Sequence, residues 1–238
     1  MEILGLTKTT LLDYPEHVAA TIFTGGCNLR CPFCHNRDLV FPEEGISSGR
    51  TIYYSEDEIL SFLQKRKNIL SGICITGGEP TLQADLIAFI HKVKTLGLRV
   101  KLDTNGFRPD ILRFLIQEQL IDYVAVDIKN SPQKYAQTSG LSTCYLEHIQ
   151  ETVELLLHQS GNLPYEFRTT VVKELHTQED MHMIGKWIQN AKAYYLQPFV
   201  ASSHMITDSY SCHDEDTLHS FLNICRQYVP NTHLRSMK

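Results

Sequence analysis

The 238-residue sequence lacks the features that would direct it to a membrane, to a nucleic acid or out of the cell. No apolar run approaches the roughly 20 residues that a membrane-spanning helix requires. The opening residues MEILGLTK have no basic head followed by a long apolar stretch, so no secretory signal peptide is expected. With 22 Lys and Arg against 27 Asp and Glu, the chain has no basic excess for binding phosphates. We therefore expect a cytoplasmic protein with neither a membrane nor a nucleic-acid partner.

No internal repeat or low-complexity linker divides the sequence, which favours a single domain over residues 1–238. Short apolar segments alternate with amphipathic ones, a pattern typical of a parallel α/β fold. Strands are expected over 19–25, 72–76, 98–103, 122–129, 164–172 and 193–197. Helices are expected over 55–68, 84–96, 110–119, 145–160, 177–190 and 214–228, with a loop over 36–54. Six strand–helix units predict a partial (β/α)6 barrel of the TIM type, with parallel strands and outer helices. Ser55 and Glu58 predict a capping box at the first helix.

Three of the seven cysteines lie close together, with the spacing Cys-x3-Cys-x2-Cys over Cys27, Cys31 and Cys34. A structural zinc site requires a fourth Cys or His ligand, and a ferredoxin-type cluster uses four thiolates. No fourth thiol lies nearby, so the loop suits a 4Fe–4S cluster with one iron left open for chemistry. The alternative is a non-catalytic zinc or iron–sulfur module. The remaining cysteines are scattered, which disfavours a second cluster: Cys74, Cys144, Cys212 and Cys225.

Charged residues alternate with apolar ones in two of the predicted strands. Because side chains of a strand point alternately to opposite faces, the charged face should line the barrel interior. That face carries Tyr123, Ala125, Asp127 and Lys129 on one strand and Arg99, Lys101 and Asp103 on the other. Active sites of α/β barrels lie at the carboxyl ends of the strands. Four motifs fall at such ends, those of Cys27, Gly77, Asp103 and Lys129.

The cysteine loop, with Phe33 before its last cysteine, resembles the cluster-binding loop of the radical SAM enzymes. Within that superfamily the chain resembles the glycyl-radical-enzyme activases, and among these the activating proteins of anaerobic ribonucleoside-triphosphate reductases. The resemblance rests on Asp13-Tyr14-Pro15, Phe23-Thr24-Gly25-Gly26-Cys27-Asn28, Cys34-His35-Asn36, Gly77-Gly78-Glu79-Pro80, Asp103-Thr104-Asn105-Gly106 and Asp127-Ile128-Lys129. It implies reductive cleavage of S-adenosylmethionine to a 5′-deoxyadenosyl radical that abstracts hydrogen from a glycine of a partner enzyme. It also implies a flavodoxin or ferredoxin as reductant.

The resemblance further implies roles for individual residues. The three cysteines ligate the cluster, and Phe33 and the backbone of His35 lie beside the adenine of S-adenosylmethionine. The other implied contacts to this ligand are Gly77, Gly78, Glu79, Asp103, Asn105 and Lys129. The oxygens of Asp103, Thr104, Ala125 and Asp127 could also hold a monovalent cation, which prefers oxygen ligands.

Two charged residues have a second interpretation. Arg168 could clamp the methionine carboxylate with its planar guanidinium, or form a salt bridge with Glu166 or Asp127. Lys129 could contact the ligand, or pair with a carboxylate inside the barrel.

Most of the remaining histidines are expected to be solvated. A rival function is a radical SAM enzyme that acts on a small molecule, such as a 7-carboxy-7-deazaguanine synthase, although the exit Cys34-His35-Asn36 favours an activase.

Overall fold

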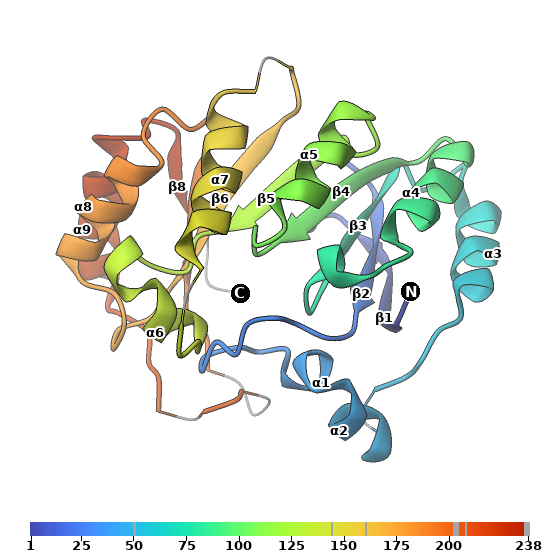
Figure 1. Ribbon diagram of the computed structural model, residues 1–238, viewed down its shortest axis with the longest axis horizontal. Coiled ribbons are helices and arrows are strands. Elements are labelled where there is room, and N and C mark those ends of the chain that lie inside the picture. Colours follow the sequence, from blue (N-terminus) through green and yellow to red (C-terminus); the bar gives the residue numbers. More distant parts are fainter. Residues whose placement is uncertain (50, 144, 160, 202–204, 208, 236–238) are drawn as a thin grey trace. The chain divides into compact units, whose positions relative to one another are not determined.

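The computed structural model describes residues 1–49, 51–143, 145–159, 161–201, 205–207 and 209–235 (Figure 1). Its strands are β1 (Ile3–Thr10), β2 (Ala19–Thr24), β3 (Gly72–Gly77), β4 (Arg99–Thr104), β5 (Tyr123–Asp127), β6 (Tyr165–Val171), β7 (Tyr194–Pro198) and β8 (Thr232–Leu234). Its α-helices are α1 (Arg37–Val40), α2 (Pro42–Ser47), α3 (Glu56–Arg66), α4 (Leu86–Thr95), α5 (Pro109–Gln117), α6 (Tyr135–Ser139), α7 (Leu146–Leu157), α8 (Gln178–Trp187) and α9 (Glu215–Arg226). Two short 3₁₀ turns are η1 (Pro80–Leu82) and η2 (Pro132–Lys134).

The strands follow one another in sequence order across the sheet, from β1 to β8. β1 pairs with β2 in the antiparallel sense, whereas β2–β3–β4 and β6–β7–β8 pair in parallel. Among the described strands, hydrogen bonds do not close this sheet into a ring. The fold is therefore the open, TIM-like α/β class that the sequence predicts, with two strands more than expected. β1 escapes prediction because its second half is exposed and polar, and β8 because it has only 3 residues.

The chain forms two compact units. The first comprises Met1–Asn28, Asn36–Thr104 and Asp110–Val124, and the second comprises Leu29–His35, Asn105–Pro109 and Ala125–Lys238. The single domain expected from the sequence stays a prediction. In the described part of the chain, no helix has the length and apolar character needed to cross a membrane.

In the first unit, α3 and α4 lie side by side along one face of β2–β4 (Figure 1). The predicted capping box starts α3: Glu58 N–H donates to Ser55 Oγ at 3.3 Å, and Ser55 N–H donates to the Glu58 carboxylate at 2.8 Å. Both helices direct apolar side chains inward, among them Ile59, Leu63, Phe89, Ile90 and Val93, all of which are fully buried.

The prediction of a loop over 36–54 was wrong, because this segment contains α1 and α2. Pro42 stands in the first turn of α2, where its missing N–H costs nothing, and two glutamates follow it. Gly45 lies in the middle of this helix, and a Cβ there would meet the Thr51 hydroxyl and the backbone oxygen of Asp38. A glycine that looks like a loop residue in the sequence is thus a packing requirement.

In the second unit, α8 and α9 pack against each other, and α9 packs against β8 (Figure 1). A second capping box, formed by Thr177 and Asp180, starts α8. Two further boundaries differ from expectation. The helix expected over 145–160 ends at Leu157, and Ser160 lies outside the described residues. The unpredicted helix α6 ends at Ser139 and is followed by Gly140, whose φ of 69° favours glycine.

Candidate active site

A backbone turn in the first unit holds the start of the cysteine loop. Glu79 N–H donates to the carbonyl oxygen of Gly26, the residue before Cys27, at 2.8 Å. Gly77 has a φ of 121°, and a Cβ on Gly78 would collide with that same carbonyl oxygen. Since only glycine tolerates this conformation and this close approach, the Gly-Gly pair is required where β3 meets the cysteine loop. Cys27 itself is partly buried.

The Glu79 carboxylate links the ends of β3 and β4. Its Oε1 atom accepts hydrogen bonds from the hydroxyls of Thr81 at 2.5 Å and Thr104 at 2.7 Å. Glu79 is buried, with only 1% of its surface exposed, so these donors compensate a carboxylate removed from water. Glu79, expected near the ligand, and Thr104, expected at the cation, therefore contact each other at the carboxyl edge of the strands.

An ion pair between Lys101 and Asp103 confirms the predicted alternation along β4. Lys101 is 2% exposed and its Nζ atom also lies 3.9 Å from Cys74 Sγ and 5.7 Å from the ring centroid of Tyr123. Cys74 packs in β3, as predicted, and is fully buried. The sequence places Lys101 on the interior face without a role. The structure shows that Asp103, the expected ligand contact, has a buried ammonium group beside it.

The rest of the cysteine loop belongs to the second unit, where backbone hydrogen bonds fix it. Cys34 N–H donates to Cys31 O at 3.0 Å, which closes a tight turn. Arg30 N–H donates to Ser139 O at 2.9 Å, and a Cβ on Gly140 would collide with the backbone of Arg30. The end of α6 therefore supports the loop. Cys31 is buried and Cys34 is partly buried.

Aromatic contacts surround the two residues expected near the adenine. Phe33 is 4% exposed, and its ring meets that of Tyr210 edge-on with centroids 6.4 Å apart. The ring of His35 lies 5.4 Å from that of Phe199, and His35 is exposed. Their contact with S-adenosylmethionine stays a prediction.

Asp127 lies between two cations in the second unit. Its carboxylate accepts from Lys129 Nζ at 3.0 Å and from Arg168 Nε at 2.9 Å. Burial by itself would raise the pKa of Asp127, but the two cations outweigh it and hold the pKa well below its usual value. Burial lowers the pKa of Lys129, and Asp127, followed by Cys31, reverses this effect and raises it. The group therefore stays fully ionised and carries a net single positive charge.

The structure shows one of the ion pairs considered for Arg168. Its salt bridge with Asp127 is present, and Glu166 accepts from Arg235 Nη2 at 2.7 Å. Both Arg168 and Glu166 are buried on β6, and the role of Arg168 as a clamp for the methionine carboxylate stays a prediction. The Lys129 ion pair with an interior carboxylate is also present. Because the net charge of the group is positive, these contacts leave it suited to an anionic ligand group.

Asn105 forms a turn after β4. Its Oδ1 atom accepts from Phe107 N–H at 3.1 Å, an arrangement that reverses the backbone locally. Gly106 follows with a φ of 77°, and its carbonyl oxygen accepts from the Thr152 hydroxyl at 2.7 Å. Ala125, whose carbonyl was expected at a cation, is fully buried.

No three His, Cys, Asp or Glu side chains among the described residues are arranged to hold a metal ion. The monovalent cation site stays a prediction, and its two acidic members form the ion pairs described above. Outside the cysteine loop, Cys225 is a poor ligand because burial raises its pKa to about 12. Cys144 lies outside the described residues.

Sequence reasoning missed one buried residue beside Lys129. His176 was expected among the solvated histidines, but it is fully buried and its ring contacts the Lys129 backbone. It lies in the polar stretch Lys173-Glu174-Leu175-His176-Thr177, which has no periodic pattern that signals burial. Lys101, in contrast, was detectable from strand alternation alone.

The sequence profile of the Radical SAM superfamily matches residues 21–182. The chain therefore belongs to the radical SAM superfamily, which implies a 4Fe–4S cluster and S-adenosylmethionine. The donor chemistry suits the cluster, since the cysteine loop offers three thiols, although they do not form a preassembled metal group among the described residues.

Three similar proteins refine this assignment. A Methanocaldococcus jannaschii protein, provisionally named a glycyl-radical enzyme activating enzyme, is 30% identical over 244 residues, covering 99% of this chain and 96% of that protein. A 7-carboxy-7-deazaguanine synthase of Hyperthermus butylicus is 40% identical over 175 residues, covering 73% of this chain and 65% of that enzyme. The crystal structure of a radical SAM methyltransferase from Sphaerobacter thermophilus has a TM-score of 0.70 at 14% identity, covering 93% of this chain and 67% of that chain. This last likeness shows the shared fold.

Proposed function

We propose that this protein is a glycyl-radical-enzyme activase. The observation that carries the proposal is the similarity over nearly the full length of both chains to the Methanocaldococcus jannaschii protein named as such an enzyme. The exit Cys34-His35-Asn36 from the cysteine loop supports the same class. The partner is a glycyl radical enzyme, with anaerobic ribonucleotide reductase the first candidate, and the electron donor is a flavodoxin or ferredoxin.

The chain's own residues bind and orient the reactants. Cys27, Cys31 and Cys34 would hold the cluster. When bound, the cluster supplies the electron that cleaves S-adenosylmethionine to methionine and a 5′-deoxyadenosyl radical, which takes a hydrogen atom from a glycine Cα of the partner. The net positive group of Lys129 and Arg168 around Asp127 would bind the methionine carboxylate by charge and hydrogen bonding.

Backbone and apolar groups would complete the recognition of S-adenosylmethionine. The Gly77-Gly78 turn, which has no side chains, would present backbone oxygens to the methionine ammonium. Phe33, which is buried, would pack beside the adenine. Asp103 would contact the same ligand with its carboxylate oriented by Lys101.

The proposal is tested under strictly anaerobic conditions. The protein is reconstituted with iron and sulfide, reduced with dithionite and mixed with S-adenosylmethionine, and 5′-deoxyadenosine is measured by chromatography. Candidate glycyl radical enzymes are then added, and electron paramagnetic resonance is recorded. We expect an organic doublet with the cognate partner. Absence of cleavage by a protein with an intact cluster would contradict the radical chemistry and favour a non-catalytic module.

A second candidate is a radical SAM enzyme that acts on a small molecule. It is favoured by the 40% identity to the Hyperthermus butylicus 7-carboxy-7-deazaguanine synthase, which covers less of either chain than the activase similarity does. Cleavage of S-adenosylmethionine without a glycyl doublet from any partner, together with turnover of the synthase substrate, would replace the activase proposal with this one.

A further inference from the structure

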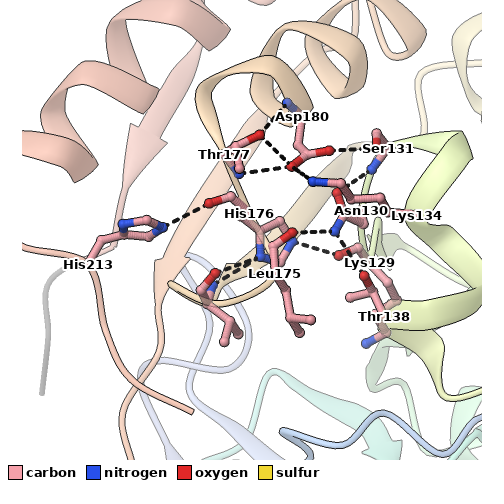
Figure 2. Close-up of polar contacts among 11 residues, drawn as sticks. Lys129, Asn130, Ser131, Lys134, Thr138, Leu175, His176, Thr177, Asp180 and His213 are labelled. Atoms are coloured by element: carbon pink, nitrogen blue, oxygen red, sulfur yellow. Dashed lines mark hydrogen bonds and ion pairs between the residues drawn. The ribbon is translucent and has the colours of Figure 1, made fainter.

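His176 lies between the ends of β5 and β6, where it contacts the backbone of both (Figure 2). Its Nε2 atom is 2.9 Å from the carbonyl oxygen of Lys129, the residue proposed to bind S-adenosylmethionine. Its Nδ1 atom is 3.1 Å from the backbone nitrogen of Val172, just after β6. The side chain is fully buried, the contact with Val172 is buried, and the contact with Lys129 is partly buried. The imidazole thus connects two strand ends.

The two contacts define the tautomer of His176. The Lys129 oxygen can only accept a hydrogen bond, so Nε2 must carry the hydrogen. The Val172 N–H can only donate, so Nδ1 must offer its lone pair. The Val172 carbonyl oxygen accepts instead from the backbone N–H of His176 at 2.9 Å. A neutral imidazole satisfies every group, and burial agrees with this because it lowers the pKa of His176.

The residues before and after Lys129 also form hydrogen bonds with β6 and with the turn that follows it. The Thr169 hydroxyl donates to Ile128 O at 2.7 Å. The buried Asn130 amide donates to Leu175 O at 3.0 Å. Consecutive residues 128–130 are therefore each hydrogen-bonded to β6 or to the turn that follows it. This arrangement fixes the backbone from which the Lys129 side chain extends toward Asp127.

Beyond Asn130, the segment that follows β5 is joined to α8 through Asp180 (Figure 2). The Asp180 carboxylate accepts from Ser131 Oγ at 2.9 Å and from Lys134 Nζ at 2.6 Å. His213 Nε2 lies 3.0 Å from His176 O, which ties the histidine backbone into the network as well. A network satisfied at so many points gives His176 one defined position.

We propose that His176 is a positioning residue for Lys129, and that it fixes the Lys129 backbone so that the ammonium group meets the carboxylate of S-adenosylmethionine beside Asp127 and Arg168. The inference rests on the proposed ligand role of Lys129. Hydrogen-bond partners of metal ligands typically contribute about 10- to 100-fold to affinity or activity, and we expect an effect at the lower end of this range for His176. The hydrogen bond to Lys129 O carries the effect, whereas the contact with Val172 holds the ring.

Two variants separate these contacts. In His176→Gln the amide nitrogen reaches the position of Nε2 and can still donate to Lys129 O. In His176→Asn the shorter amide occupies the position of Nδ1. It still accepts the hydrogen bond from Val172 N–H but cannot reach Lys129 O. His182→Gln, on the exposed face of α8, is the matched control. Each is compared in the wild-type and Lys129→Met backgrounds.

The measurement is equilibrium binding of S-adenosylmethionine to the anaerobic protein with its cluster loaded and oxidised, so that no cleavage occurs. Thermal unfolding of each variant is recorded in parallel. We expect His176→Asn to bind about tenfold more weakly and His176→Gln and His182→Gln to bind close to wild type. In the Lys129→Met background, the Asn and Gln variants should bind equally.

Three results would overturn the proposal. Equal binding by the Asn and Gln variants with Lys129 present would remove the role of the Lys129 hydrogen bond. If the affinities of the Asn and Gln variants for S-adenosylmethionine differed by the same factor in the Lys129→Met background, His176 would be a stabilising residue only. Wild-type affinity of Lys129→Met would remove the ligand role of Lys129 as well. In that last case, the cleavage and doublet assays still decide separately whether the protein is an activase.

Discussion

Replacing Gly78 with alanine should damage the cysteine loop selectively. A Cβ there collides with the Gly26 carbonyl oxygen, and because both groups belong to the backbone, no side chain can rotate away. Separating them breaks the 2.8 Å hydrogen bond from Glu79 N–H to Gly26 O and the 2.8 Å bond from Gly78 N–H to Thr24 O. At about 1 kcal/mol net for each bond, and at least about 1 kcal/mol for the forced displacement, the free energy of unfolding should fall by about 3 kcal/mol.

A matched control separates this collision from the strain of placing an alanine at a positive φ. Gly97 has a φ of 79°, and a Cβ added there would meet nothing within 4 Å, so Gly97→Ala should cost only about 1 kcal/mol. Urea unfolding of the metal-free protein measures both losses. After reconstitution, iron content and S-adenosylmethionine cleavage should drop for Gly78→Ala and remain normal for Gly97→Ala. Equal losses of stability and of iron in the two variants would refute the reasoning.

The ion pairs and thiols of the site support three further predictions. Because its cationic neighbours hold the pKa of Asp127 below its usual value of 3.8, its contribution to stability is present above that pH and is lost as the pH falls. The difference in free energy of unfolding between wild type and Asp127→Asn should therefore shrink from about pH 7 to about pH 3, and a constant difference would contradict the ion-pair account. Lys101→Met removes one partner of a buried pair and should cost about 3 kcal/mol in urea unfolding, part of which Lys101→Met/Asp103→Asn recovers; strictly additive losses would show that the two side chains are not coupled. Cys34→Ala should abolish the visible absorption of the cluster and cleavage of S-adenosylmethionine, whereas Cys225→Ala should retain both, and identical behaviour of the two variants would refute the assignment of ligands.

Features that depend on residues close in sequence were predictable. The three-cysteine spacing led to the superfamily that the profile match confirms. Alternation along the strands placed Lys101 with Asp103 and Asp127 with Lys129, and both pairs form ion pairs across two residues. In these cases the backbone geometry of a loop or strand determines which side chains face each other, so spacing is sufficient.

Features that depend on distant partners required the tertiary structure. From the sequence alone Arg168 could bind the ligand or pair with Glu166 or Asp127, and only the structure shows its contact with Asp127, 41 residues away. The helices α1 and α2 form where the composition indicated a loop, and Gly45, which looked like a loop residue, is required there by close packing.

His176 shows the limit most clearly, since its stretch of sequence has the polarity of a solvated turn. Only the chain's return after β6 carries its imidazole to Lys129, 47 residues earlier, and buries the ring. The sequence by itself determined the chemistry available to this protein, because ligand type and spacing are local properties. The tertiary structure decided which groups are buried and which atoms they contact, because burial depends on segments that meet only when the chain folds.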